Sequence, residues 1–407
     1  MKIWLINNYN TLPEHGQFTR NYYFGKILKN MGHEPVVFVG SHPHNTNLQL
    51  IDGDDKYRIY QEEPFPWVLV KTRNYEGSKI SRVISMFEFY QNMKEAAKYF
   101  KKPDAIVGSS AHPLAALLAI QFAKKFGCKG IVEIRDLWPE SILAYRILGA
   151  NNPIVLLMRR FEKWLYVHAD AVVFTMAGAY DYIKEQNWQK EIPQSKVHYI
   201  NNGIDLEQFD YNKELFTVQD KDLQNENIFK VVYTGSIRHV NNLGKLLDVA
   251  KLVKNPNVKF LIWGDGDEVP QLQERVENEK ITNVMFKGRV QKKYVPYIVC
   301  KSNLNVVHGI SSVLSRYGTS NNKIFDYMAA GKPILHDFFI KYNPVIDYNA
   351  GVEVQSGKPE DIAAMIDKLA TSSPDVLAVY GKNAREAAKE FDFKVLTEKL
   401  ISIIDSL

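Results

Sequence analysis

Two series of alternating apolar and amphipathic segments run along this chain of 407 residues. In each series a short apolar run predicts a buried strand, and a segment with apolar residues three or four positions apart predicts the helix that follows. Strands are predicted at 2–6, 35–39, 105–107, 130–134 and 171–174 in the first series, and at 229–234, 258–263, 284–287, 304–307, 333–336 and 352–354 in the second. Because strands that alternate with helices form parallel sheets with helices on both faces, the sequence predicts an α/β protein with two doubly wound, Rossmann-like domains facing each other across a cleft.

The two series meet at a polar segment, residues 210–227, which has the composition of a linker. We therefore expect a first domain over 1–208 and a second over 209–392. The last segment, 393–407, is amphipathic and has the pattern of a helix that crosses back onto the first domain. Residues 41–78 are rich in proline and glycine, so we expect them to be irregular.

The most informative stretch is 317–336, where a polar loop enters a short helix and the helix leads to a strand. Three polar residues at 320–322 suit the N-cap position, so we expect the helix to begin near Lys323, and Gly331 suits the left-handed residue after its end. Free N–H groups with a lysine in the first turn favour an oxyanion such as a diphosphate, and Asp326 could accept hydrogen bonds from a sugar. The alternative is a capped amphipathic helix with solvated charges.

The cysteine content and the lengths of the apolar runs indicate the cellular compartment. Only two cysteines are present, at 128 and 300, so neither a disulfide framework nor a cysteine metal site is expected and a reducing compartment is favoured. The N-terminal segment turns polar after its first strand, unlike a signal peptide, and no apolar run approaches about 18 residues, so we expect a cytoplasmic protein without a membrane-spanning helix.

The net charge of +5 is concentrated in the first half of the chain, because lysine and arginine balance aspartate and glutamate after residue 205. This small surplus is compatible with an anionic partner such as a phospholipid surface or a lipid-linked pyrophosphate. It is far below the charge of a nucleic-acid-binding surface, so we expect no nucleic acid partner.

The predicted helix over 79–102 leaves two interpretations open. Ile80, Val83, Ile84 and Phe87 share one face, and basic residues lie at both ends. Such a helix can lie on a membrane surface. Core packing is the more common fate of an apolar stripe, and we expect it here.

Candidate site residues in the first domain follow predicted strands, at the edge where doubly wound sheets bind ligands. Gly16 lies in the loop after the first strand, His112 in a loop after the third, and Asp136 in a segment that also contains Arg135. His112 and Asp136 are therefore candidates for acceptor contact or proton transfer. The alternatives are a helix cap for His112 and a structural ion pair for Asp136. No G-x-G-x-x-G fingerprint is present, and the D-x-D match at 52–54 reads as a turn.

Five motifs in the correct order resemble the family-4 retaining glycosyltransferases of the GT-B fold. The resemblance is greatest to the subgroup that builds bacterial O-antigen and capsule sugars, including aminosugar transferases of the L-fucosamine type. The motifs are Arg-Asp-Leu-Trp-Pro-Glu-Ser at 135–141, Asn-Asn-Gly-Ile-Asp at 201–205, Gly-Asp-Gly at 264–266, Gly-Arg-Val at 288–290 and Asn-Lys-Ile-Phe-Asp-Tyr-Met-Ala-Ala-Gly-Lys-Pro at 322–333.

The resemblance implies that the first domain binds a polyprenyl-pyrophosphate-linked saccharide acceptor and that the second binds a UDP-sugar, without a metal ion or other cofactor. It places the nucleotide base at Arg289 and Val290 and the ribose at Asp326, and it assigns diphosphate and sugar contacts to the loop at 319–323. The donor-binding residues it implies are Gly16, Gly235, Ser236, Gly264, Arg289, Val290, Thr319, Ser320, Asn321, Asn322 and Asp326.

The chain departs from the family pattern where charged residues are usual. Gly318 stands where the first acid of E-x7-E is expected, and Ser236 and Asn241 replace an arginine and a lysine that grip the phosphates. We expect Arg238 and Lys323 to take over the cationic role. Arg135 also replaces a histidine of the family.

The resemblance also implies a mechanism, in which the donor phosphate takes the acceptor proton and cationic groups stabilise the leaving diphosphate. With the acceptor-side candidates, the predicted catalytic residues are Arg238, Lys323, Asp136 and His112. Two alternatives remain: a GT-B enzyme that hydrolyses and epimerises the same donor, and a degenerate scaffolding homologue.

Overall fold

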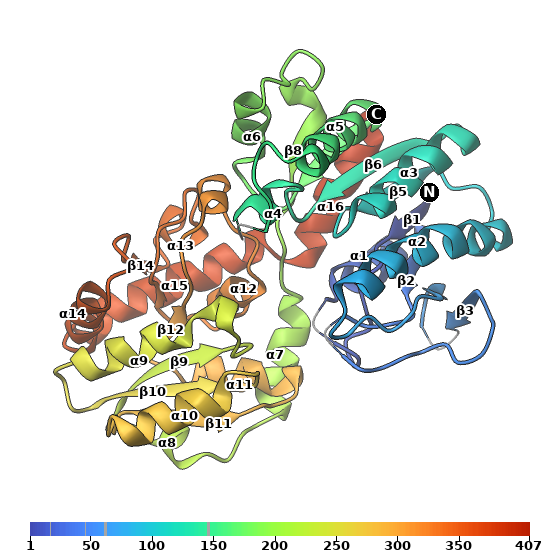
Figure 1. Cartoon of the computed structure of the whole chain (residues 1–407). Helices are drawn as coiled ribbons and strands as arrows, with labels where there is room; N and C mark the ends of the chain where they lie inside the picture. The colour runs from blue at the N-terminus through green and yellow to red at the C-terminus, as the bar shows by residue number, and fades with distance from the viewer. Residues whose placement is uncertain (17, 45, 61–62, 145–146) are drawn as a thin grey trace. The chain divides into compact units, whose positions relative to one another are not determined.

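The computed structural model describes residues 1–16, 18–44, 46–60, 63–144 and 147–407. The chain forms two compact units, shown in Figure 1. Unit 1 contains Met1–Asn201 together with Phe393–Leu407, and unit 2 contains Asn202–Asp392. The final helix thus belongs to unit 1, as its pattern indicated, whereas the first division falls after Asn201 rather than after residue 208.

The segment expected to be a linker, residues 210–227, is largely part of unit 2. It contains the end of α7 (Leu206–Leu215) and all of α8 (Lys221–Gln224). Phe209 of α7 and Leu223 of α8 are buried, so both short helices pack on unit 2. Because each of these helices buries a single apolar residue, the segment resembles a linker in composition although it is folded.

Unit 1 is built on an eight-stranded sheet with the order β3-β4-β2-β1-β5-β6-β7-β8. The strands are β1 (Lys2–Ile6), β2 (Glu34–Gly40), β3 (Tyr57–Tyr60), β4 (Trp67–Val70), β5 (Ala105–Ser109), β6 (Lys129–Ile134), β7 (Ala171–Phe174) and β8 (Val197–Tyr199). Only the β3–β4 pair is antiparallel among these described strands. Both of its strands lie within 41–78, where we expected irregular structure.

Helices cover both faces of this sheet. They are α1 (Arg20–Asn30), α2 (Lys79–Ala96), α3 (Pro113–Phe126), α4 (Glu140–Ala144), α5 (Pro153–His168), α6 (Ala179–Glu185) and α16 (Phe393–Ser406), with short 3-10 turns at Ala97–Tyr99 and Gln194–Lys196. Side chains of β1 alternate between the faces, with Ile3 packing toward α1 and α16 and Trp4 packing toward α2 and α3. Figure 1 shows α3 next to both α2 and α5.

The apolar face predicted for the 79–102 helix is not in the core. Ile80 is 74% exposed and Phe87 is 56% exposed, and Val83 and Ile84 are also exposed. The helix instead buries Ser85, Phe89, Met93 and Ala96, which follow one another at intervals of three or four residues. Our prediction of core packing for the Ile80–Phe87 face was therefore wrong, because the more C-terminal residues of the helix supply the buried stripe.

Unit 2 is built on a six-stranded sheet with the order β11-β10-β9-β12-β13-β14. The strands are β9 (Phe229–Thr234), β10 (Val258–Trp263), β11 (Val284–Gly288), β12 (Leu304–Val307), β13 (Ile334–His336) and β14 (Gly351–Glu353), and every pair among them is parallel. Its remaining helices are α9 (Leu243–Leu252), α10 (Val269–Asn278), α11 (Val295–Cys300), α12 (Asn322–Ala329), α13 (Pro344–Asp347), α14 (Pro359–Ala370) and α15 (Pro374–Glu390), with 3-10 turns at His239–Asn241, Lys292–Tyr294 and Val313–Tyr317. The carboxyl ends of these strands lie at one edge of the sheet, which is where the predicted donor-binding residues follow them.

Across the described residues, no helix is long and apolar enough to span a bilayer. In the same part of the chain, no group of three or more His, Cys, Asp or Glu side chains is arranged to hold a metal ion. Asp52 and Asp54, the residues of the D-x-D match, are exposed beside the turn at Gly53.

Candidate functional site

The helix α12 begins at the carboxyl edge of the unit 2 sheet, close to the predicted position. Asn321 is its N-cap, and its side-chain oxygen accepts a hydrogen bond from the backbone N–H of Lys323 at 3.2 Å. Ile324, Phe325 and four following residues are buried against the core, and Gly331 has a φ of 64° just beyond the C-cap. Capping and apolar spacing therefore define this helix locally, as the sequence predicted.

The Lys323 ammonium lies at the start of this helix, beside the loop after β9. Its Nζ is 4.1 Å from the centroid of the Tyr233 ring, and a methyl group built on Gly235 would lie 3.0 Å from it. Burial lowers the pKa of the Lys323 ammonium, although Tyr327 and Asp337 partly oppose this. No described residue makes a hydrogen bond or ion pair with it, so the charge is available to an anionic ligand.

Two glycine loops pack closely beside Lys323. The backbone N–H of Gly235 donates to the carbonyl of Trp263 at 3.0 Å, which ties the loop after β9 to the end of β10. A Cβ on Gly264 would lie 1.8 Å from the carbonyl oxygen of Gly235. Only glycine fits at 264 because the two backbones touch there.

The two positions that lack the family's phosphate-gripping cations interact with each other. Ser236 donates a hydrogen bond to the side-chain oxygen of Asn241 at 3.0 Å. Arg238, between them, is half-buried, and its side chain makes no hydrogen bond or ion pair with the described residues. Arg238 and Lys323 thus remain the candidate cations, on either side of the loop at 235–237.

Asp326 lies one turn into α12 and is 4% exposed. Its carboxylate forms an ion pair with Lys292, whose side chain is 54% exposed. Lys292 belongs to the segment that follows Arg289, which is exposed, and Val290, which is half-buried. We did not predict Lys292 from the sequence, because a lysine after a loop carries no signal that its partner lies on α12.

An internal hydrogen bond and another from Asn202 hold the polar loop before α12. The Thr319 hydroxyl accepts from the backbone N–H of Asn321 at 3.2 Å, and the carbonyl of Ser320 accepts from the Asn202 side chain at 2.6 Å. Asn322 is exposed. The Asn202 contact shows that the Asn-Gly motif at 201–205 supports this loop.

The environment of His112, in unit 1, does not suit the predicted role in proton transfer. Its side chain is fully buried and packs edge-on against Tyr9 and Phe89, and His112 occupies the N-cap position of α3 without a side-chain capping hydrogen bond. Burial, with the nearby charge of Arg82, lowers the pKa of His112 to about 3, so the ring is neutral at neutral pH. A buried neutral imidazole without access to solvent cannot exchange protons with an acceptor in this conformation.

The other two unit 1 candidates lie at the carboxyl edge of that sheet. Gly16 lies close to Thr11, since a methyl group at this position would be 2.9 Å from the Thr11 Cγ2 atom. Asp136 is exposed and forms part of the lining of a mainly apolar hollow with Trp138 and Glu162. Burial raises the pKa of the Glu162 carboxyl to about 8, against hydrogen bonds donated by two tyrosines, Tyr166 and Tyr182.

Comparison with known families accounts for both units. Residues 15–208 match the model described as Glycosyltransferase Family 4, and residues 216–387 match the model described as Glycosyl transferases group 1. Each half of the chain therefore matches a glycosyltransferase family. The matches support the resemblance inferred from the five motifs, and the O-antigen and capsule subgroup stays a prediction.

Two named relatives of this glycosyltransferase are distant. WbjE of Pseudomonas aeruginosa, named as a probable glycosyltransferase, is 22% identical over 269 residues, 65% of this chain and 66% of the relative. TuaH of Bacillus subtilis (strain 168), whose name assigns it provisionally to teichuronic acid biosynthesis, is 24% identical over 277 residues, 67% of this chain and 65% of the relative. The matched region thus spans just under two thirds of each relative's length.

Solved structures similar to this glycosyltransferase have the GT-B fold, which confirms the predicted fold class. HepE of Anabaena in complex with UDP covers 100% of both chains with a TM-score of 0.67 and 14% identity. WaaG, a glycosyltransferase involved in lipopolysaccharide biosynthesis, covers 99% of both with a TM-score of 0.65 and 15% identity. At these identities the likeness concerns the fold alone.

Proposed function

We propose that this glycosyltransferase transfers a sugar, with retention, from a UDP-sugar to a lipid-linked saccharide in surface polysaccharide synthesis. The observation that carries the proposal is the Lys323 ammonium, which is partly desolvated, unpaired among the described residues and placed beside the Gly235 backbone at the start of α12. A cation and a helix N-terminus at the carboxyl edge of a parallel sheet suit a diphosphate that becomes a leaving group. In this proposal no metal ion is needed.

Uridine is proposed as the nucleotide because similar structures were solved with UDP and with UDP-glucose. In this chain, Arg289 and Val290 would meet the base and Asp326 the ribose. The polar loop of Thr319, Ser320 and Asn321 would hold the sugar. Gly318 stands at the position of the first acid of E-x7-E, so no carboxylate is present there to bind the sugar hydroxyls. An N-acetylated aminosugar remains our proposal for that sugar, from the subgroup that the motifs resemble.

We expect Asp326→Ala to weaken UDP binding by about tenfold to a hundredfold, because a carboxylate that accepts ribose hydroxyls is worth about 1.5–3 kcal/mol. Isothermal titration calorimetry with UDP measures the change. Asp361→Ala, in which an exposed acid on α14 is removed from the same unit, is the matched control and should bind like the original protein. Equal affinities in all three proteins would remove Asp326 from the site.

Product analysis separates this proposal from its two alternatives. A transferase consumes the UDP-sugar when acceptor is supplied and forms a lengthened saccharide. A hydrolysing epimerase releases free UDP without acceptor, and a scaffolding homologue gives no binding heat with any nucleotide. Activity that survives in chelator would support a reaction without a metal ion.

The acceptor and the membrane belong to the same proposal. The exposed face of α2 carries Ile80 and Phe87, and the exposed face of α5, which also packs on α3, carries Leu157 and Trp164. The basic residues on α5 are Arg159, Arg160 and Lys163, whereas its one acid, Glu162, is buried. Apolar side chains beside cations suit the surface of an anionic membrane, where a polyprenyl-linked acceptor would be held.

We expect the double variant Ile80→Ser/Phe87→Ser to bind anionic phospholipid vesicles at least tenfold more weakly, because each large apolar side chain contributes about 1.5–3 kcal/mol when it leaves water. Co-sedimentation with phosphatidylglycerol vesicles measures this. Val376→Ser/Val379→Ser removes two exposed apolar residues from α15 and is the control. Equal binding by both variants, or no vesicle binding by the original protein, would contradict the membrane surface proposed here.

A further inference from the structure

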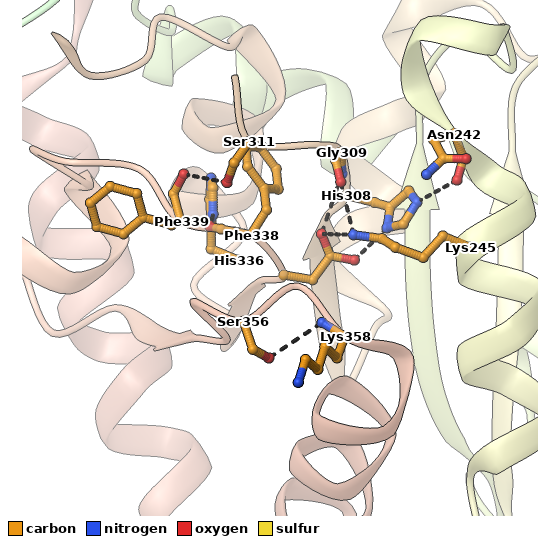
Figure 2. Close-up of polar contacts among 11 residues, drawn as sticks. Asn242, Lys245, His308, Gly309, Ser311, His336, Phe338, Phe339, Ser356 and Lys358 are labelled. Carbon is orange, nitrogen blue, oxygen red and sulfur yellow. Dashed lines mark hydrogen bonds and ion pairs between the residues drawn. The ribbon is translucent and has the colours of Figure 1, made fainter. Parts of the chain in front are cut away.

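A buried charged cluster lies at the carboxyl edge of the unit 2 sheet, next to the residues discussed above but outside the predicted site. It consists of His308, Asp337 and Lys245, and Figure 2 shows His308 and Lys245 with the backbone they contact. His308 follows β12 and Asp337 follows β13, and these strands pair in parallel with Val307 opposite His336. The register therefore brings the two side chains together, and both are buried.

Two polar contacts define the position of the His308 ring. Its Nε2 lies 2.9 Å from the carbonyl oxygen of Asn242, which can only accept, so Nε2 carries a hydrogen. Its Nδ1 forms an ion pair with the Asp337 carboxylate. Asp337 also accepts from the Gly309 N–H at 3.3 Å and faces Lys245 Nζ at 3.8 Å. The His308 ring therefore bridges the Asn242 carbonyl and the Asp337 carboxylate.

The cluster joins the loops on which the proposed donor site depends. Asn242 ends the loop that begins at Gly235, and the His308 ring holds its carbonyl. Gly309 begins the loop that leads to Gly318, and Lys245 Nζ donates to its carbonyl at 2.9 Å. Further along, the Ser311 hydroxyl donates to the carbonyl of Phe339 at 2.9 Å, which ties that loop to the segment after β13. Figure 2 shows these contacts.

We infer that His308 is a positioning residue for donor binding. Through its two ring nitrogens it ties the loop proposed for the diphosphate to Asp337, which in turn holds the start of the loop proposed for the sugar. The inference rests on the proposed function for the identity of the ligand. It goes beyond that function because His308 touches neither ligand nor reacting atoms in this role and acts through Asn242 and Asp337.

The charged and titratable groups around the cluster come from several elements. Lys245 of α9 and Lys323 of α12 are cations near Asp337, and Tyr233 of β9 also faces it. Burial lowers the pKa of His336 in β13, and Glu353 of β14 lies near enough to oppose this shift. With the carboxylate and the Asn242 carbonyl both facing the His308 ring, a side chain that reaches only one of them loses the other contact.

Two substitutions separate the contacts. His308→Asn places an amide N–H near the position of Nδ1, keeps the contact with Asp337 and removes the contact with Asn242. His308→Gln places an amide N–H near the position of Nε2 and keeps the contact with Asn242. The control is His198→Asn in β8 of unit 1, which changes a histidine outside the cluster.

The test combines UDP calorimetry with amide hydrogen exchange of the loop at 235–242 in the ligand-free protein. We expect about tenfold weaker UDP binding and faster exchange of this loop in His308→Asn, which loses the Asn242 contact, and neither change in His198→Asn. Unchanged loop exchange or unchanged UDP affinity in His308→Asn would overturn the inference. If the original protein binds no UDP, the proposed function fails, whereas the exchange result still decides whether His308 holds the loop. If His308→Asn does not fold, His308→Gln is compared in its place, and an unchanged UDP affinity counts against the tie.

Discussion

Lys323→Ala is expected to reduce kcat of sugar transfer by about 10²–10³, the scale observed when one preorganised donor to a developing negative charge is removed. The expected loss follows from the surroundings of the Lys323 ammonium in unit 2. Lys323 Nζ lies over the Tyr233 ring and beside Gly235, where desolvation strengthens its interaction with a diphosphate. The measurement is the release of UDP from UDP-sugar in the presence of acceptor, at saturating donor.

Two further variants make the Lys323 result specific. Lys323→Arg keeps the charge but needs more room beside Gly235, so we expect partial recovery of kcat. Lys254→Ala removes an exposed lysine of the same unit and should leave kcat unchanged. If Lys323→Ala raises KM without lowering kcat, the ammonium binds the ground state and the transition state equally, and the proposed role in leaving-group stabilisation is incorrect. Undiminished turnover would remove Lys323 from the site.

Much of the fold could be predicted because each feature has a local cause. The apolar run at 229–234 forms a buried strand, and Asn321 caps α12 through its own side chain. Such signals need only a few neighbouring residues. The strands β3 and β4 were missed because the prolines before Trp67 resemble a loop, whereas β4 is held by its long-range pairing with β2.

Less of the site could be predicted, because its contacts join residues far apart in the sequence. The partner of Asp326 is Lys292, and the partner of His308 is Asp337. Neither pair has a spacing that identifies it. The register of β12 and β13 brings His308 and Asp337 together, whereas Lys292 lies in a 3-10 turn and Asp326 on α12, which meet only in the folded unit. The exposed face of α2 was assigned to the core for a related reason, since the sequence shows two apolar stripes but not which one meets the sheet.

The strongest expected effect on stability concerns a buried ion pair in unit 1. Arg20, at the start of α1, donates from Nε to the Glu133 carboxylate of β6 at 2.7 Å, and both side chains are almost fully buried. The same guanidinium donates to the backbone carbonyls of Ile200 and Asn201, the last residues before unit 2. Farther along α1, Tyr23 stacks on Phe393, where the chain returns to unit 1. Helix α1 therefore contacts the chain both where it leaves unit 1, at Ile200 and Asn201, and where it returns, at Phe393.

Arg20→Met is expected to lower the free energy of unfolding of unit 1 by about 3–5 kcal/mol, because it leaves the Glu133 carboxylate buried without its main partner. Urea titration followed by fluorescence of the buried Trp4 and Trp67 measures the change. Arg73→Met breaks the more exposed pair with Glu88 and is the control, with little expected change in the free energy of unfolding because solvent screens an exposed pair. A loss in Arg20→Met no larger than this control would show that the buried pair does not stabilise unit 1.

The pH dependence gives the same ion pair an independent test. Burial opposes the charged form of Glu133, but the charges of Arg20 and Arg135 and hydrogen bonds from Ser109 and Arg20 keep its pKa below the usual value. A carboxyl whose pKa is depressed on folding contributes stability above its unfolded pKa of about 4.5, and this contribution is lost as the pH falls through the folded value. Arg20→Met removes the largest of the depressing interactions and leaves the burial. We therefore expect the original protein to lose stability on acidification over this range, and the variant to show a weaker loss or a gain. Parallel acid profiles in the two proteins would mean that the Glu133 proton affinity does not depend on Arg20, and that the structural role assigned to the pair is wrong.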